Sequence, residues 1–143
     1  MMRPGMIVET VVVWVVPVLL AASGLLFLKG HNAPGGGFIA GLLTAAALVL
    51  RLVAFGSGLY RGKEDFYIRL ISAGLLIALC TATAPAILGY SFFTHTFGHV
   101  HVPVIGDIEL ASAALFDLGV YLVVVGTVVT VIGALNTREV DGD

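Results

Sequence analysis

The sequence has few charged residues for its length. Of its 143 residues, 11% are Asp, Glu, Lys or Arg and 59% are hydrophobic, whereas about 25% charged and 45–50% apolar is usual for a soluble domain. Seven basic and nine acidic side chains are too few to cover a soluble globule of this size. The net charge of −2 also leaves no basic surface for DNA or RNA. The composition therefore predicts a protein whose solvent is largely lipid.

The sequence also lacks the residue patterns of common enzymes. The single cysteine, Cys80, excludes an intramolecular disulfide and any cysteine-rich metal site. It lies in an apolar run, where a thiolate is disfavoured, so we expect it to serve packing. No Gly-x-Ser-x-Gly, His-Glu-x-x-His or pair of carboxylates on one helix face occurs. We therefore predict that the chain is not an enzyme and needs no cofactor.

Four apolar runs are long enough to cross a bilayer, which takes roughly 20 residues of helix. They lie near 7–28, 38–55, 68–89 and 111–135. The first run is not preceded by the charged segment of a cleaved signal peptide, so it is predicted to stay in the membrane. Helices are expected because every backbone amide in hydrocarbon must find its partner within its own segment. The sequence predicts an all-α integral membrane protein, a single domain over 1–143 with four transmembrane helices.

The basic residues indicate the orientation of these helices. With four spans, both termini and the middle connector share one side of the membrane. Only Lys29 lies on the other side, and six of the seven basic residues lie on or next to the shared side: Arg3, Arg51, Arg61, Lys63, Arg69 and Arg138. By the positive-inside rule, both termini are predicted to be cytoplasmic.

Small residues at intervals of four or seven predict where the helices pack closely, because close approach drives helix association in lipid. The fourth run carries Gly119, Gly126 and Gly133 at a period of seven, and the second carries Gly41 four residues after Gly37. The third run has a similar row at Gly74, Ala78 and Ala82. Each helix is therefore expected to have a close neighbour along this face.

Asp117 is the only ionisable residue predicted to lie well inside a span. A carboxylate at such a depth is costly unless it is paired, hydrated or protonated. At 100° per residue, Asp117 shares a helix face with Tyr121 and lies some 160° from Gly119. One four-helix chain is not expected to cover both faces, which argues for partner subunits. The carboxylate is either part of a proton or cation relay or a buried group that bonds to a neighbouring helix or caps a broken one.

The connector between the first two spans is rich in glycine. It contains His31, Asn32 and Pro34, followed by Gly35, Gly36, Gly37 and Phe38. The three glycines allow positive φ and close backbone approach. A phosphate-binding loop would continue with Gly-Lys-Ser/Thr, which is absent. The segment is either a structural turn or a surface that contacts another polypeptide at the membrane edge.

Three histidines lie in the longest connector. His95, His99 and His101 could bind a metal through their imidazoles only if a fourth ligand, such as Asp107 or Glu109, folded back. The same segment contains three phenylalanines, so its histidines are also consistent with anchors at the membrane interface. We predict no metal site.

Two segments resemble a known family. Gly30-His-Asn-Ala-Pro-Gly-Gly-Gly-Phe38 and Leu115-Phe-Asp-Leu-Gly-Val-Tyr-Leu-Val-Val-Val-Gly126 look like the MrpB (or MnhB) component of the Mrp-type multisubunit Na+/H+ antiporters. The resemblance covers essentially the whole chain. It implies a hetero-oligomeric antiporter in the bacterial cytoplasmic membrane that exports Na+ in exchange for H+. Large antiporter-like subunits are thought to carry the proton channels, so the MrpB component is implied to be their small companion.

The resemblance and the residues together predict an accessory antiporter subunit. It would be needed for assembly, through the turn from Pro34 to Phe38, and would contribute Asp117 to an ion pathway at a subunit interface. Its partners would be the other antiporter subunits, the lipid bilayer, and Na+ and H+ as transported ions. One alternative is the equivalent subunit of a membrane-bound, energy-converting hydrogenase. Another is a small transporter acting as a homo-oligomer, although the two halves show no inverted repeat.

Overall fold

The computed structural model describes residues 4–30, 35–56, 60–87 and 108–140. These residues form the helices α1 (Pro4–Lys29), α2 (Gly36–Phe55), α3 (Glu64–Ile87) and α4 (Ile108–Val140). All four are long and apolar enough to cross a membrane. The prediction of an all-α protein with four transmembrane helices is therefore confirmed.

The helices extend beyond some of the predicted spans because helix formation does not stop where hydropathy falls. α3 begins at Glu64 rather than near Ile68, with Glu64 and Asp65 in its first turn. Acidic residues are favourable at that position because the helix dipole is positive there. α4 has 33 residues and continues to Val140, whereas the apolar run ends near Leu135. These polar turns are helical although they lie outside the hydrophobic segments.

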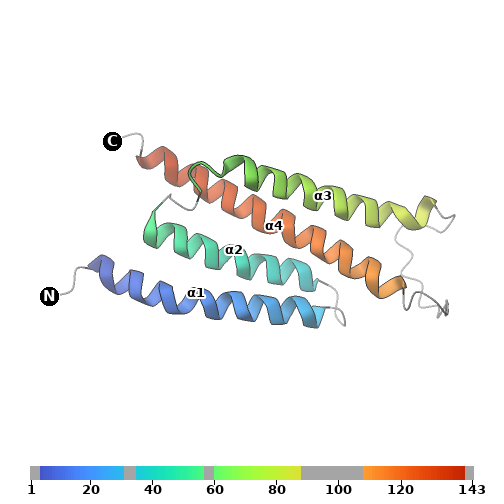
Figure 1. The fold of residues 1–143 in the computed structure, drawn as a ribbon, viewed down its shortest axis with the longest axis horizontal. Coiled ribbons are helices and arrows are strands. Elements are labelled where there is room, and N and C mark those ends of the chain that lie inside the picture. Colours follow the sequence, from blue (N-terminus) through green and yellow to red (C-terminus); the bar gives the residue numbers. More distant parts are fainter. Residues whose placement is uncertain (1–3, 31–34, 57–59, 88–107, 141–143) are drawn as a thin grey trace.

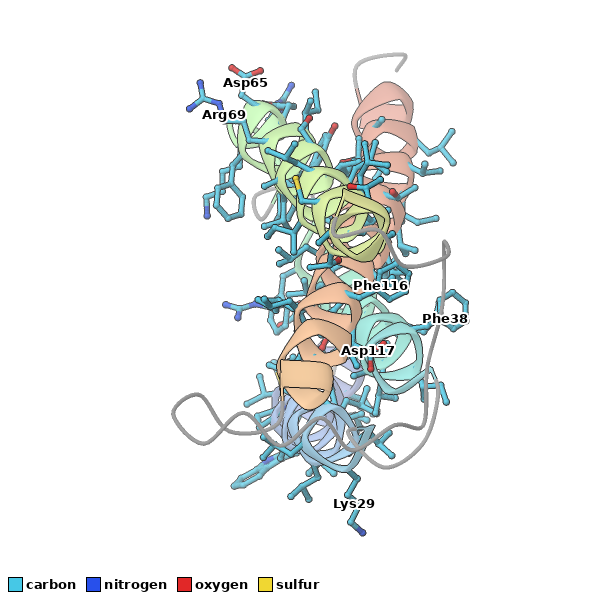
Figure 2. The ribbon with its side chains drawn as sticks, turned by 90° about the vertical axis from the view of Figure 1, so that its right-hand side faces the viewer. Lys29, Phe38, Asp65, Arg69, Phe116 and Asp117 are labelled. Atoms are coloured by element: carbon cyan, nitrogen blue, oxygen red, sulfur yellow. The ribbon has the colours of Figure 1, made fainter. Side chains whose placement is uncertain are left out.

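The four helices form a row rather than a closed bundle. Close backbone contacts join α1 to α2, α2 to α4, and α4 to α3. Figure 1 shows the helices side by side in the order α1, α2, α4, α3, and Figure 2 shows the same row viewed more nearly along the helix axes. Within the described helices, α2 and α4 therefore have a helical neighbour on each side, while α1 and α3 lie at the ends of the row.

Glycines bring α3 and α4 together. A Cβ atom added to Gly74 would lie 2.6 Å from the carbonyl oxygen of Gly119, and one added to Gly119 would lie 2.7 Å from that of Gly74. Further along α4, Gly126 lies against Ile71 and Gly133 against the ring of Tyr60. The row of glycines with a period of seven thus faces α3 and the turn that precedes it.

The opposite side of α4 packs against α2. Gly41 of α2 lies against Val124 and the backbone of Tyr121, and a Cβ on Gly41 would come within 3.1 Å of the Val124 side chain. The same chain therefore covers both non-lipid faces of α4, one with α2 and the other with α3. The expectation that a single chain cannot cover both faces is wrong, because α4 occupies the interior of the row.

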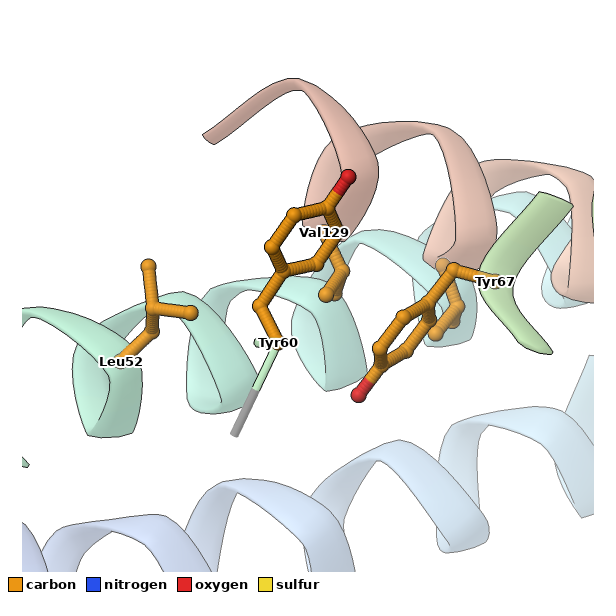
Figure 3. Packing of buried hydrophobic residues seen from close by; sticks show 5 residues of the cluster. Leu52, Tyr60, Tyr67 and Val129 are labelled. Carbon is orange, nitrogen blue, oxygen red and sulfur yellow. The ribbon is translucent and has the colours of Figure 1, made fainter. Parts of the chain in front are cut away.

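The buried apolar side chains form two clusters along this row. One contains Val125 and Val129 of α4, Leu52 of α2, and Tyr60 and Tyr67 from the start of the third segment (Figure 3). The two tyrosine rings stack with centroids 5.9 Å apart. The other cluster joins α1 to α2 through Val12, Val16 and Ala47.

Candidate functional site

Asp117 of α4 caps the first turn of α2. The backbone N–H of Gly37 donates a hydrogen bond to Asp117 Oδ2 at 3.3 Å. α2 has no capping side chain of its own, since Gly35 precedes it and no acidic residue lies in its first turn. The first amides of a helix lack partners within the helix and carry a partial positive charge. The carboxylate of Asp117 therefore supplies from α4 the negative group that α2 lacks.

The glycines at this end of α2 permit the backbones to approach. Gly35 has φ 94°, in the left-handed region that favours glycine, whereas Gly36 and Gly37 are already helical. A Cβ on Gly37 would collide with the carbonyl group of Asp117, and one on Gly36 would collide with the backbone of Gly30. The close contacts of this turn are thus made within the chain, with the end of α1 and with α4.

One turn further along α4, three hydroxyl groups link three helices. We call Ser23 of α1, Thr44 of α2 and Tyr121 of α4 the hydroxyl chain. Ser23 Oγ lies 2.6 Å from Thr44 Oγ1, which lies 3.0 Å from Tyr121 Oη. Ser23 Oγ also donates to the carbonyl oxygen of Ala40 at 2.8 Å. The hydroxyl chain therefore ties α1, α2 and α4 together in the apolar interior.

The chemistry of the groups fixes the direction of these hydrogen bonds. A hydroxyl can donate one hydrogen bond, and Ser23 donates its own to the carbonyl oxygen of Ala40. Thr44 must then donate to Ser23, and Tyr121 must donate to Thr44. The hydroxyl chain ends on a helical carbonyl oxygen, which accepts a hydrogen bond but has no proton to pass on. This arrangement acts as a clamp between helices rather than as a proton relay.

A groove of about 280 Å³ opens beside the hydroxyl chain. It is lined by Leu20, Ser23, Gly24, Phe27, Thr44, Leu118 and Tyr121. The ring of Phe27 packs edge-on against that of Tyr121, with centroids 5.6 Å apart. The polar atoms of this layer thus come from α1, α2 and α4, next to the layer that contains Asp117.

The other predicted site residues are distributed as follows. Phe38 is 49% exposed and points away from the row (Figure 2). His31, Asn32 and Pro34 lie outside the described residues, as do His95, His99 and His101. Cys80, expected to be packed, is exposed on α3. Among the described residues, no three His, Cys, Asp or Glu side chains come together as a metal site would require.

Sequence reasoning identified Asp117 but missed the hydroxyl chain. The available signal was the presence of Ser23, Thr44 and Tyr121 within otherwise apolar spans, because hydroxyl residues in membrane helices commonly bond across to neighbouring helices. Three residues on three helices have no fixed spacing in the sequence. Only the packing of the helices shows that they meet.

Comparison with known families shows which family this chain belongs to. The model for a domain related to the MnhB subunit of Na+/H+ antiporter matches residues 7–130. The chain belongs to the MnhB family. This MnhB chain is 44% identical over 135 residues to the Na(+)/H(+) antiporter B subunit of Bacillus subtilis, covering 94% of each protein. It is 42% identical over 116 residues to the protein of the same name in Alkalihalophilus pseudofirmus, covering 80% of this chain and 81% of that one.

A third relative has a longer chain. The MnhB chain is 37% identical over 128 residues to a probable K(+)/H(+) antiporter A/B subunit of Rhizobium meliloti, covering 89% of this chain and 13% of the relative. Together with the four spans, these relatives identify a multi-pass bacterial membrane protein. They do not favour the hydrogenase alternative.

Proposed function

We propose that this chain is an accessory subunit of a multisubunit antiporter that exchanges a monovalent cation for protons. The observation that carries the proposal is its match, along most of the length of both chains, to proteins named as the B subunit of a Na(+)/H(+) antiporter. The structure agrees with an accessory role, since its polar interior groups hold helices together and the hydroxyl chain ends on a carbonyl oxygen.

The cation of this antiporter is proposed to be Na+. Two relatives carry Na+ in their names, whereas the Rhizobium meliloti relative is named for K+. That relative is also named as an A/B subunit, and the MnhB-like part covers only 13% of it. This supports a place for the chain beside a much larger partner.

Asp117 is proposed to contribute to an ion pathway where this chain meets a partner subunit. Its carboxylate is only partly buried, and one of its oxygens binds the amide of Gly37. The neighbouring Phe38 and Phe116 are 49% and 38% exposed, and both rings point to the same side of the row (Figure 2). Exposed aromatic side chains are typical of protein contact surfaces. A partner seated on them would cover the part of Asp117 that α2 leaves exposed.

Everted membrane vesicles test the antiporter function. In a strain that lacks the gene for this chain, Na+-dependent collapse of an imposed pH gradient should be lost, and a plasmid copy should restore it. K+ is added in a parallel assay. Unchanged exchange of both cations in the deletion strain would contradict the proposed function.

Variants of Asp117 separate its charge from its capping role. Asp117→Asn keeps an oxygen that can accept the hydrogen bond from Gly37 but removes the charge. The complex should therefore assemble while the transport rate falls roughly tenfold or more, which corresponds to about 1.4 kcal/mol of free energy. Asp117→Leu removes both and should also lower the amount of chain in the membrane. Asp117→Glu is the control that retains the charge. Normal transport with normal pH and Na+ dependence in Asp117→Asn would remove Asp117 from the pathway.

A further inference from the structure

A second groove lies at the other end of α2 and has a different chemistry. It has a volume of about 670 Å³ and lies between α1, the last turns of α2 and the residue that precedes α3. We call it the cationic groove and define it by Val13, Val16 and Pro17 of α1, Arg51 and Phe55 of α2, and Lys63. Its volume falls in the range of about 300–1,000 Å³ that is typical of ligand sites.

Among the described residues, the two cations of the groove have no negative partner. No Asp or Glu is among the described residues that line it, and neither Arg51 nor Lys63 forms an ion pair within the described part of the chain. Both side chains are exposed. Two positive charges beside an apolar wall suit a negative ligand that also carries apolar groups.

The depth of the groove matches the position of a lipid headgroup. Arg51 lies four residues before the end of α2 at Phe55, about 6 Å at a rise of 1.5 Å per residue. An arginine at such a position can extend its guanidinium to the headgroup layer. Val13, Val16 and Pro17 continue the groove along α1 toward the apolar part of the span. A phospholipid has this same order of groups, with a charged phosphate followed by acyl chains.

Pro17 adds a further polar feature. Because proline has no backbone N–H, the carbonyl of Val13 lacks its helical donor, and both residues line the groove. A headgroup that carries hydroxyls, such as that of phosphatidylglycerol, can donate to this oxygen. The distribution of basic residues predicts that this end of the chain is cytoplasmic, and basic pockets on that side commonly bind anionic lipid headgroups.

We propose that the cationic groove binds one anionic phospholipid, with its phosphate between Arg51 and Lys63 and an acyl chain along Val16 and Pro17. A carboxylate from another membrane subunit would also be negative, but it would have to be placed there at a cost in desolvation. The lipid phosphate is already present at this depth of the bilayer. Lipid binding here does not depend on the antiporter function, because the groove is formed by this chain alone.

Lipid binding to the full-length chain tests the proposal. The tagged chain, with any subunits that co-purify, is extracted from membranes and titrated with phosphatidylglycerol or phosphatidylcholine, and bound lipid is measured by native mass spectrometry. Each cation near a lipid surface contributes about 1 kcal/mol, roughly fivefold in affinity. The Arg51→Gln/Lys63→Gln variant should therefore bind phosphatidylglycerol about 30-fold more weakly.

Two control variants make the result specific. Arg69→Gln removes an exposed cation of α3 that does not line the groove, and it should bind as the wild type does. Arg51→Lys/Lys63→Arg keeps both charges and should retain most of the affinity. Equal binding of phosphatidylglycerol by the Gln variant and the wild type, or no preference over phosphatidylcholine, would overturn the proposal.

Photocrosslinking identifies the occupant in the membrane. Val13 is 56% exposed, so a photoreactive residue fits at this position. Illumination should add the mass of a phospholipid to the chain, and the adduct should decrease when Arg51 and Lys63 are replaced by Gln. An adduct with another protein as the main product would show that a polypeptide occupies the groove, and would overturn the lipid assignment.

Discussion

At the scale of single residues, the start of α2 depends on a side chain that lies 80 positions later in the sequence. Asp117 accepts from the amide of Gly37 because α2 has no cap of its own. A carboxylate at a partly buried helix N-terminus contributes up to about 2 kcal/mol. Because Asp117 caps α2, its effect on stability must be measured separately from any role in transport. The Asn variant keeps the cap and loses only the charge, whereas the Leu variant loses both.

Replacing Gly37 with Ala should loosen the contact between α2 and α4. The added methyl group would collide with the Asp117 carbonyl, and such overpacking typically costs about 1–3 kcal/mol. The loss of stability is measured by unfolding the protein with sodium dodecyl sulfate while its helix content is monitored. Gly24→Ala is the matched control, because nothing lies within 4 Å of its added Cβ. Equal stability of the two variants would show that the close approach at Gly37 is not required.

Two similar substitutions, one in the hydroxyl chain and one outside it, should differ in their effect on stability. Thr44→Val breaks two hydrogen bonds between helices, which in membrane proteins are worth about 0.6 kcal/mol each and at most about 1.7 kcal/mol. Thr130 has a buried hydroxyl without a partner among the described residues, so Thr130→Val should leave stability unchanged or raise it. The same detergent titration compares the two. Thr44→Ser should restore the stability, and a Thr44→Val protein as stable as Thr130→Val would contradict the clamp.

The sequence identified Asp117 because a carboxylate in an apolar run is costly and therefore conspicuous. It left open whether Asp117 relays ions or bonds to a neighbouring helix, since a partner 80 residues away has no local signal. The structure supplies that partner, Gly37. Serine, threonine and tyrosine are common in membrane helices, so the hydroxyl chain could not be distinguished from isolated residues by sequence alone.

At the scale of the helices, close packing distinguishes the two faces of α4. Gly119 meets Gly74 of α3 on one face, and Tyr121 meets Gly41 of α2 on the other. The spacing of glycines predicted that such contacts exist but not which helix makes each one. Apolar length predicted the spans because the bilayer thickness sets it, whereas the polar first turn of α3 and last turns of α4 could not be predicted from hydropathy.

A large residue at Gly74 should separate α3 from α4. Gly74→Leu would place side-chain atoms where the backbone of Gly119 and the Leu122 side chain now lie. We expect the free energy of unfolding to fall by about 1–3 kcal/mol or more. Ala73→Leu is the matched control on the same helix, since Ala73 is exposed. Disulfide crosslinking between cysteines introduced in α3 and α4 should fall in Gly74→Leu alone. Unchanged crosslinking would contradict the α3–α4 contact.

At the scale of the whole molecule, the open row leaves apolar side chains exposed on all four helices. They include Trp14 and Val18 of α1, Phe38 of α2, Leu76 of α3 and Leu115 of α4. Lipid covers part of this surface, and the proposed partner subunits cover another part near Phe38 and Phe116. The cytoplasmic position of both termini, drawn from the basic residues, stays a prediction.

Identifying the proteins that co-purify with this chain tests most directly whether it is part of an antiporter. The chain is tagged at its C-terminus, purified in a gentle detergent and analysed by mass spectrometry for every protein that co-purifies. We expect large antiporter-like proteins together with small membrane companions, and a lower yield of that complex for Phe38→Ala. Recovery of the chain alone from an otherwise intact preparation, or with hydrogenase and iron–sulfur proteins, would contradict the proposed function.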